Sequence, residues 1–166
     1  MEMLSSQPLA YLITIHTYGS WLPGRAPGYV DRRHNQFGES ILSPDRQLHE
    51  LKQKQIDQKV ILLNKQMRHV VDQAIREHLS VANLALEAMH VRTNHVHMVV
   101  QVGDISVEKI MLQCKAWATR RLRENHCLPH QQCVWSRHGS TRYLWNESQV
   151  QAAVHYVLHE QGAPLD

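Results

Sequence analysis

Two histidines separated by one residue stand in the apolar segment AMHVRTNHVHMVVQV (residues 88–102). In a strand, residues two apart share a face, so His95 and His97 project together while Val96 and Met98 point to the opposite, buried face. Two imidazoles side by side on a strand form half of a site for a divalent metal ion. The alternative interpretation is a pair of polar residues on the solvated side of a strand.

A tyrosine and a carboxylate share one face of the segment NESQVQAAVHYVLHEQ (residues 146–161). Apolar residues recur there at helical spacing and predict a stripe that faces the core; they are Val150, Val154, Val157 and Leu158. Tyr156 lies well away from the centre of that stripe, and Glu160 follows one turn later on its face. A phenol acts as a nucleophile when a nearby metal ion polarises the electrophile. The alternative is a partly exposed tyrosine that packs on a neighbour.

Strand and helix patterns alternate along the chain. Alternating or β-branched segments predict strands at residues 11–16, 83–89 and 95–102, and a hairpin made of residues 132–137 and 141–145. Helical spacing and capping residues predict helices at about 43–82, from Ser106 onward, and from Asn146 to about Gln161. This order favours an α+β fold in which an antiparallel sheet carries helices on one face, of the ferredoxin-like or RNA-recognition-like kind.

Length and composition fit one domain. The chain has 166 residues, of which 43% are hydrophobic and 20% charged, close to the globular average. We expect a single domain over residues 1–166, with a long loop insertion rich in glycine and proline at about 17–45. No apolar run reaches the ~18 residues of a membrane span, the N-terminus lacks signal-peptide features, and the three cysteines fit reduced thiols. These features predict a cytoplasmic protein with no membrane partner.

Basic residues gather after Ser106, although the formal net charge is only +3. Clustered cations neutralise phosphates, so they favour a polyanionic partner; the candidates are Lys109, Lys115, Arg120, Arg121, Arg137 and Arg142, with Arg32 and Arg33 in the long loop. Tyr18, Trp21 and Trp145 are candidates for stacking on unpaired bases. A solvated helix face is the alternative interpretation of the cations, and core packing is that of the tryptophans.

The segment His95-Val96-His97 resembles the His-hydrophobe-His motif of the HUH endonucleases. With one tyrosine on a later C-terminal helix, the chain resembles the single-tyrosine transposases, above all the REP-associated group. The stretch HTYGSWLPG…DRRHNQFG near the N-terminus is similar to a signature of that subgroup. The resemblance runs from Tyr11 to nearly the end of the chain, and it rests on the agreement of motif order and spacing.

The resemblance implies an HUH endonuclease fold and a specific chemistry. The paired histidines of such a motif, here His95 and His97, hold Mg²⁺ or Mn²⁺ against the scissile phosphate. Tyr156 matches the nucleophile, which forms a 5′-phosphotyrosine and releases a 3′-OH. The family often places an amide four residues after the tyrosine as third metal ligand; Glu160 occupies that position here, and His159 and Gln161 are the alternatives. The implied partner is single-stranded or hairpin DNA, bound by a monomer or a homodimer.

Two other functions fit the same residues. A domesticated DNA- or RNA-binding protein would keep the fold without catalysis. A metallohydrolase would use the histidine pair to activate water, and Tyr156 would then be incidental.

Overall fold

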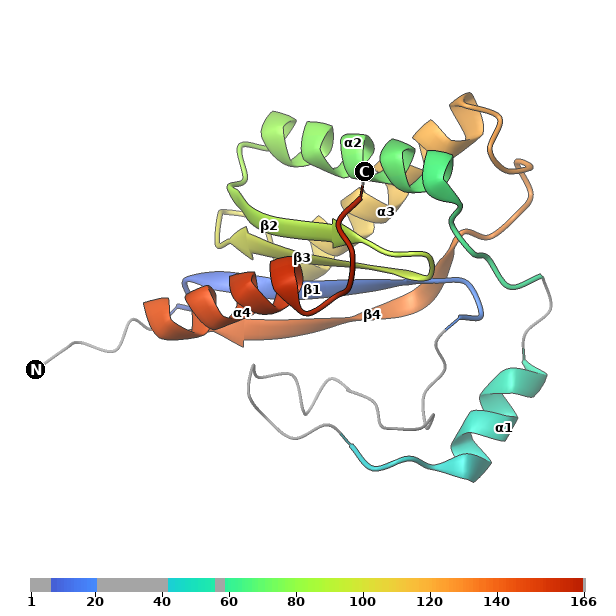
Figure 1. The fold of residues 1–166 in the computed structure, drawn as a ribbon, viewed down its shortest axis with the longest axis horizontal. Coiled ribbons are helices and arrows are strands. Elements are labelled where there is room, and N and C mark those ends of the chain that lie inside the picture. Colours follow the sequence, from blue (N-terminus) through green and yellow to red (C-terminus); the bar gives the residue numbers. More distant parts are fainter. Residues whose placement is uncertain (1–6, 21–41, 56–58, 166) are drawn as a thin grey trace, which may run out of the picture.

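The computed structural model describes residues 7–20, 42–55 and 59–165, which form a four-stranded antiparallel sheet with helices on both faces (Figure 1). The strand order is β2-β3-β1-β4. The elements, in chain order, are β1 (Ala10–Thr17), α1 (Arg46–Lys54), α2 (Lys65–Val81), β2 (Leu86–Val91), β3 (His95–Gln101), α3 (Val107–Glu124), β4 (Trp135–Leu144) and α4 (Glu147–His159). The strands with α2 and α3 make the ferredoxin-like arrangement that the sequence predicts. The loop expected at about 17–45 falls mainly on residues 21–41, outside the described residues.

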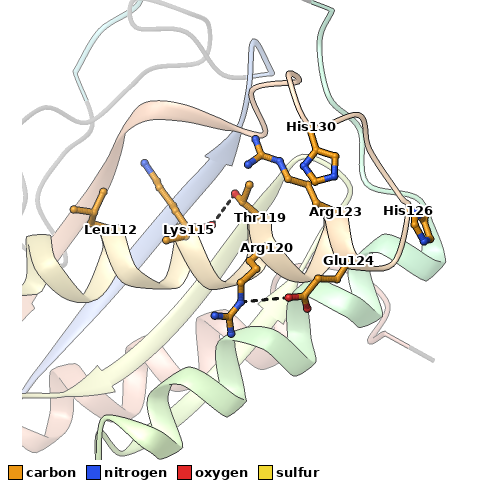
Figure 2. A pocket seen from close by; sticks show the side chains of 9 residues that line it. Leu112, Lys115, Thr119, Arg120, Arg123, Glu124, His126 and His130 are labelled. Atoms are coloured by element: carbon orange, nitrogen blue, oxygen red, sulfur yellow. Dashed lines mark hydrogen bonds and ion pairs between the residues drawn. The ribbon is translucent and has the colours of Figure 1, made fainter.

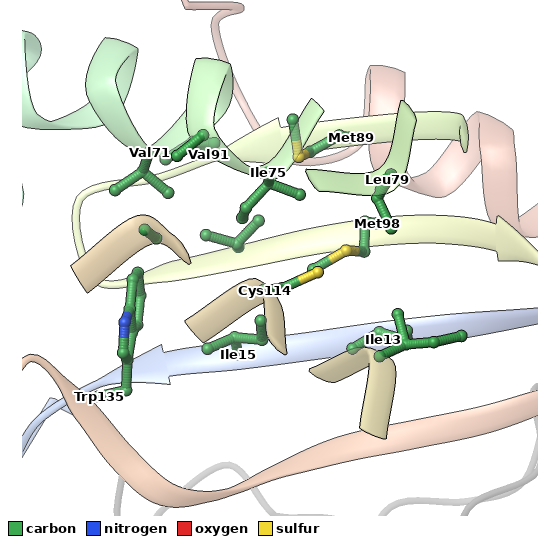
Figure 3. Packing of buried hydrophobic residues seen from close by; sticks show 14 of the residues in the cluster. Ile13, Ile15, Val71, Ile75, Leu79, Met89, Val91, Met98, Cys114 and Trp135 are labelled. Atoms are coloured by element: carbon green, nitrogen blue, oxygen red, sulfur yellow. The ribbon is translucent and has the colours of Figure 1, made fainter. Parts of the chain in front are cut away.

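The larger hydrophobic core lies between the sheet and the neighbouring helices α2 and α3 (Figure 3). The sheet contributes side chains that alternate along β1 and β3, since every second residue faces the same layer. The helices contribute apolar residues at three- and four-residue spacing. Central members of this core are Ile13, Ile15, Met98, Val71, Ile75, Leu79 and Cys114. This core covers only one face of the inner strands.

Helix α4 covers the opposite face of the sheet, so the expectation that all helices pack on one face is wrong in this respect. A second, smaller cluster lies beneath α4 and contains Leu12, Ala88, Val99, Ala153 and Val157. The central strands carry apolar residues on both faces: in β1, Leu12 is 5% exposed and its neighbour Ile13 is fully buried. A strand that is buried on both faces needs a layer on each side.

The single helix expected at about 43–82 is two helices, α1 and α2. An extended segment precedes α2, and it buries Ile61 and Leu63 while Leu62 between them is 64% exposed. The amide of Leu63 donates to the carbonyl of Thr93 at 2.6 Å. Helix α2 then begins after Asn64, whose side chain accepts from the amide of Met67 at 2.9 Å. The apolar spacing of residues 60–63 therefore reflects an alternating extended segment and not the first turn of a helix.

The hairpin expected at residues 132–145 is one continuous strand, β4, which pairs with β1 from Ala10↔Leu144 to Ile15↔Gly139. The register shifts between Ile15 and Thr17, so the strand carries an irregularity beyond Gly139. A Cβ atom at position 139 would lie 2.5 Å from both the carbonyl oxygen of Thr14 and the sulfur of Met111. Gly139 therefore allows β1 and α3 to lie close to β4 at this position, and it does not form a turn.

Replacing Gly139 by alanine should lower the free energy of unfolding by about 1–3 kcal/mol, because the new methyl group overlaps the backbone of β1. Urea denaturation monitored by circular dichroism measures the change. Gly103→Ala is the matched control, since the nearest atom there is the end of the Leu84 side chain at 2.7 Å, which can move. A Gly139 variant as stable as the control would contradict the close approach.

Capping residues set the starts of the last two helices, as the sequence predicts. The side chain of Ser106 accepts from the amide of Lys109, and that of Asn146 from the amide of Gln149 at 2.9 Å. Strand β2, by contrast, begins three residues later than expected, because Asn83 adopts a left-handed conformation with φ of 55°. Among the described residues, no helix is long and apolar enough to cross a membrane.

Candidate functional site

His95 and His97 lie on the face of the sheet that α4 covers. The alternation of β3 places Val96 and Met98 in the core beneath α2 and α3, as the sequence predicts. The two imidazole rings lie edge to face with their centroids 4.6 Å apart. The neighbouring strands add two further histidines in register, since His16 pairs with His95 and His90 pairs with His97. These four residues are called the histidine cluster below.

Both histidines of the motif use Nδ1 for a hydrogen bond to a neighbouring side chain. The Nδ1 atom of His97 lies 2.8 Å from Oγ1 of Thr14, the residue opposite it on β1. The Nδ1 atom of His95 lies 2.7 Å from Oδ1 of Asn94. Such bonds fix the orientation of each ring, which is the arrangement found around histidines that bind metals through the other nitrogen.

The imidazole of His97 is neutral at physiological pH. Burial, together with repulsion from His95, His16 and His90, lowers its pKa to about 3, while a hydrogen bond with the side chain of Gln161 opposes the change. His97 is only 8% exposed. A metal ligand must be deprotonated, and this environment holds His97 in the required form.

Tyr156 points from α4 toward the histidine cluster. Its ring centroid lies 5.4 Å from that of His97 with the planes at 65°. Ala153 and Val157 are the buried residues of α4, and Tyr156 packs at the margin of the cluster they form. Leu158, expected in the apolar stripe, is instead 46% exposed. The buried face is therefore rotated from the predicted stripe toward Tyr156, and this rotation places the phenol beside the sheet.

The chain after α4 returns toward the sheet and brings Gln161 to His97. The side chain of Gln161 hydrogen-bonds with His97 and also approaches the carbonyl of Tyr156 at 3.5 Å. His90 holds the same segment, because its Nε2 atom lies 3.1 Å from the carbonyl oxygen of Ala163. The carboxylate of Glu160 points elsewhere and lies 3.8 Å from Nε2 of His155. Of the three candidates for a third ligand, Gln161 is thus the one that contacts the histidine pair.

The donors at this site fit a divalent metal ion. In the described part of the chain, no group of three or more histidine, cysteine, aspartate or glutamate side chains could hold one. The set formed here is of another kind, two imidazoles and the carboxamide of Gln161. Imidazole nitrogen suits transition metals, and amide oxygen suits Mg²⁺ and Mn²⁺. The buried, neutral His97 with its Thr14 partner is the strongest single indication of such a site.

A family model described as "Transposase IS200 like" matches residues 55–159, more than half of the chain. The chain belongs to the IS200-like transposase family. Among curated proteins, none matches this transposase-family chain significantly.

Two solved structures are similar to this family member, each with 14% sequence identity. One is a REP-associated tyrosine transposase bound to a REP hairpin, with a TM-score of 0.46, matched over 91% of this chain and 65% of that chain. The other is a suspected transposase from Deinococcus radiodurans R1, with a TM-score of 0.49, matched over 98% of both chains. The chain therefore spans about two thirds of the length of the first. The family assignment rests on the sequence match alone.

The candidate DNA-binding cations of this IS200-like transposase lie on both sides of the sheet. Arg142 pairs with Leu12, whose side chain packs beneath α4, so Arg142 projects from the same face as the histidine cluster. Arg137 is exposed on β4. The four candidates of α3 lie behind the opposite face; they are Lys109, Lys115, Arg120 and Arg121. Arg32 and Arg33 lie outside the described residues.

Several cations of α3 make contacts within the protein. Arg121 binds both carboxylate oxygens of Glu77 at 2.7 and 2.8 Å. Arg120 lies over the ring of Trp117, 4.7 Å from its centroid. Nζ of Lys115 donates to the carbonyl of Ser136 at 2.8 Å, and burial lowers the pKa of this amine to about 8. These contacts tie α3 to α2 and β4, which is a structural role for residues expected to contact phosphates.

An open pocket of about 730 Å³ lies on the outer side of α3 (Figure 2). Lys115, Arg120 and Arg123 line it together with Glu124, which forms an ion pair with Arg120 at 3.7 Å. The pocket is separated from Tyr156 and the histidine pair by the sheet itself, since α3 and α4 pack on opposite faces. It therefore contributes nothing to the site around His97.

The aromatic residues considered for base stacking are placed differently from one another. Trp145 is 37% exposed and lies edge to face with Tyr143, 6.2 Å between centroids. Tyr18 packs against the larger core. Trp21 lies outside the described residues.

Sequence reasoning missed three residues of this site: Thr14, His16 and His90. Thr14 and His16 alternate with Ile13 and Ile15 in the first strand, so their shared face was readable. Their position beside His95 and His97 was not, because it depends on the register of β1 and β3. Gln161 was named only as an alternative ligand.

Proposed function

We propose that this transposase-family chain is a metal-dependent endonuclease and strand transferase for single-stranded or hairpin DNA, with Tyr156 as its nucleophile. The observation that carries the proposal is the contact of the Tyr156 and His97 rings, 5.4 Å between centroids, on the face where His95 also lies. A helix and a strand far apart in sequence thus present a phenol beside a neutral imidazole pair. Neither the fold nor the core requires that combination.

The proposed reaction transfers a phosphate ester to the protein. The phenol oxygen of Tyr156 bonds to the phosphorus and loses its proton, while the bond from phosphorus to the 3′ oxygen breaks and that oxygen gains a proton. The products are a 5′-phosphotyrosine and a free 3′-OH, so one ester replaces another without hydrolysis. The reverse attack by a 3′-OH on the phosphotyrosine would rejoin DNA, which is the strand-transfer half of the proposal.

His95 and His97 would hold Mg²⁺ or Mn²⁺, with Gln161 or Glu160 as the third donor. The bound ion supplies charge stabilisation at the phosphate oxygens. Thr14 and Asn94 orient the two rings through Nδ1. Gln161 is favoured as third donor by its hydrogen bond with His97, whereas Glu160 keeps the advantage of a charged oxygen.

DNA is proposed to cross the α4 face of the sheet. Arg142 projects from that face, so it can bind the phosphate backbone there. Exposed Arg137 stands five residues away on β4, so the alternation of the strand directs it to the other face. A tyrosine reaches a phosphate only when the strand is free of its partner there, which favours single strands or the ends of hairpins. The proposed protein is cytoplasmic and acts as a monomer or a homodimer. Light scattering distinguishes the monomer from the homodimer.

A covalent-adduct assay tests the proposed function. Single-stranded and hairpin DNA substrates, labelled on the strand 3′ of the expected cut, are incubated with the full chain and Mn²⁺ and then separated in SDS. We expect a labelled protein band that EDTA prevents. Cleavage without any adduct would instead identify a metallohydrolase. Tight binding without cleavage, on substrates that a related transposase cuts, would identify a non-catalytic DNA-binding protein.

Replacing Thr14 by valine should weaken Mn²⁺ binding by about 10- to 100-fold, because the His97 ring loses the partner that orients it. Valine has nearly the same shape and suits a strand, so the fold is expected to persist. Isothermal titration calorimetry with Mn²⁺ measures the change. The matched control is Thr141→Val on β4, whose partner Ile13 faces the other core. Equal Mn²⁺ affinity in both variants would remove Thr14 from the site.

A further inference from the structure

Two histidines one helical turn apart stand on the solvent side of α4. His155 and His159 are both exposed, and their ring centroids are 4.9 Å apart with the planes at 40°. Residues four apart project from the same side of a helix. The rings therefore lie one above the other and away from the sheet, on a different side of α4 from the Tyr156 ring that contacts His97.

An exposed pair of this kind has the chemistry of a transition-metal site. Two imidazoles at this helical spacing bind zinc in the His-x-x-x-His pattern of metalloproteases, and nickel and copper also prefer imidazole nitrogen. Glu160 adds negative charge beside the pair, because its carboxylate lies 3.8 Å from Nε2 of His155. Both rings are exposed, so an ion in solution can approach them.

We propose that His155 and His159 bind a divalent transition-metal ion such as Zn²⁺, Ni²⁺ or Cu²⁺, at a site separate from that of His95 and His97. Water completes the shell of the ion, and Glu160 supports it by charge. Hard ions such as Mg²⁺ favour oxygen ligands and do not occupy a site made of two imidazoles. The site at His155 and His159 is therefore expected to bind transition-metal ions in preference to Mg²⁺.

Ion binding here has a consequence for the helix that carries Tyr156. Residues 155 and 159 flank Tyr156, so an ion held by both crosslinks the helical turn in which the tyrosine stands. A ligand that binds only the folded helix stabilises it, and the stabilisation grows with the ratio of the free ion concentration to its dissociation constant. The last turn of α4 and the position of the phenol are therefore more rigid when the ion is bound. The binding site itself does not depend on the proposed reaction.

Calorimetric titration of the tag-free full chain with Ni²⁺, in excess Mg²⁺ and without DNA, tests the proposal. We expect two Ni²⁺ sites in the unchanged chain, one from each histidine pair. His159→Ala and His155→Ala should each weaken the second site by about 10- to 100-fold, at least as much as the loss of an outer-shell partner. The double variant should be no weaker than either single variant, because one imidazole alone no longer makes a site.

His130→Ala is the matched control, since it also removes an exposed histidine but lies outside α4. It should keep both Ni²⁺ sites. Saturating Ni²⁺ should also raise the melting temperature of a His97→Ala chain by about 2 °C or more, and that rise should disappear when His159→Ala is added. Full Ni²⁺ stoichiometry in His155→Ala and His159→Ala would overturn the proposal. If the unchanged chain binds Ni²⁺ at His155 and His159 but does not cleave DNA, the proposed function is wrong and the metal site stands.

Discussion

Tyr156→Phe should abolish the covalent DNA adduct and lower the rate of cleavage by at least about a thousandfold, because the nucleophile of the reaction is gone. The ring itself remains, so its edge-to-face contact with His97 persists and the fold should be unchanged. Metal binding should also persist, because the phenol is not among the proposed ligands. The adduct is measured by SDS gel electrophoresis of labelled DNA, and the metal by calorimetry.

The matched control for this variant is Tyr143→Phe. Tyr143 also loses only a hydroxyl group, and its ring packs with Tyr11 on the other face of the sheet, 5.4 Å between centroids. The control should form adduct at the rate of the unchanged chain. An adduct of normal yield in Tyr156→Phe would show that another residue attacks the phosphate. Loss of the adduct in both variants would indicate a general effect of the hydroxyl groups.

His97→Ala should lower metal-dependent cleavage by at least about a hundredfold and remove Mn²⁺ binding at this site, because a ligand is lost and Oγ1 of Thr14 loses its partner. The variant also leaves space in a buried position, so some loss of stability is expected as well. Mn²⁺ binding by calorimetry and cleavage of labelled DNA at saturating Mn²⁺ are the measurements. A restored rate at high Mn²⁺ would indicate weakened and not abolished binding.

His78→Ala separates the chemical effect from the loss of stability. His78 is similarly buried, at 5% exposed, but it lies in α2 on the other side of the sheet and packs against Trp117. The control should lose stability to a comparable degree and keep both Mn²⁺ binding and cleavage. If the two variants lose cleavage equally, the role of His97 is structural and the proposed metal site is wrong.

The local elements of the site were predictable from the sequence. The alternation of β3 placed His95 and His97 on one face, and the capping residues Ser106 and Asn146 fixed where α3 and α4 begin. These features depend on neighbours within a few residues, so a local pattern contains the information. The ferredoxin-like order of strands and helices followed from the same patterns together with the rules for connecting them.

The errors arose where a local pattern fits two structures. The apolar residues at 60–63 fit the spacing of a helix. They form an extended segment instead, in which the amide of Leu63 hydrogen-bonds to the carbonyl of Thr93. Gly139 suggested a turn, but the approach of Thr14 and Met111 decided for a continuous strand. In each case a contact with residues distant in sequence determined the local structure, and the sequence of the segment alone does not reveal that contact.

The sequence by itself determined that two imidazoles share a strand face and that a tyrosine stands on a later helix away from the centre of the apolar stripe. Only the tertiary structure decided that they meet. Both faces of β1 and β3 are apolar, so the pattern of the strands does not tell which face α4 covers. The register of β1 and β3 brought Thr14 to His97, and the returning chain brought Gln161 there. These contacts join residues far apart in the chain, and packing of the whole sheet fixes them.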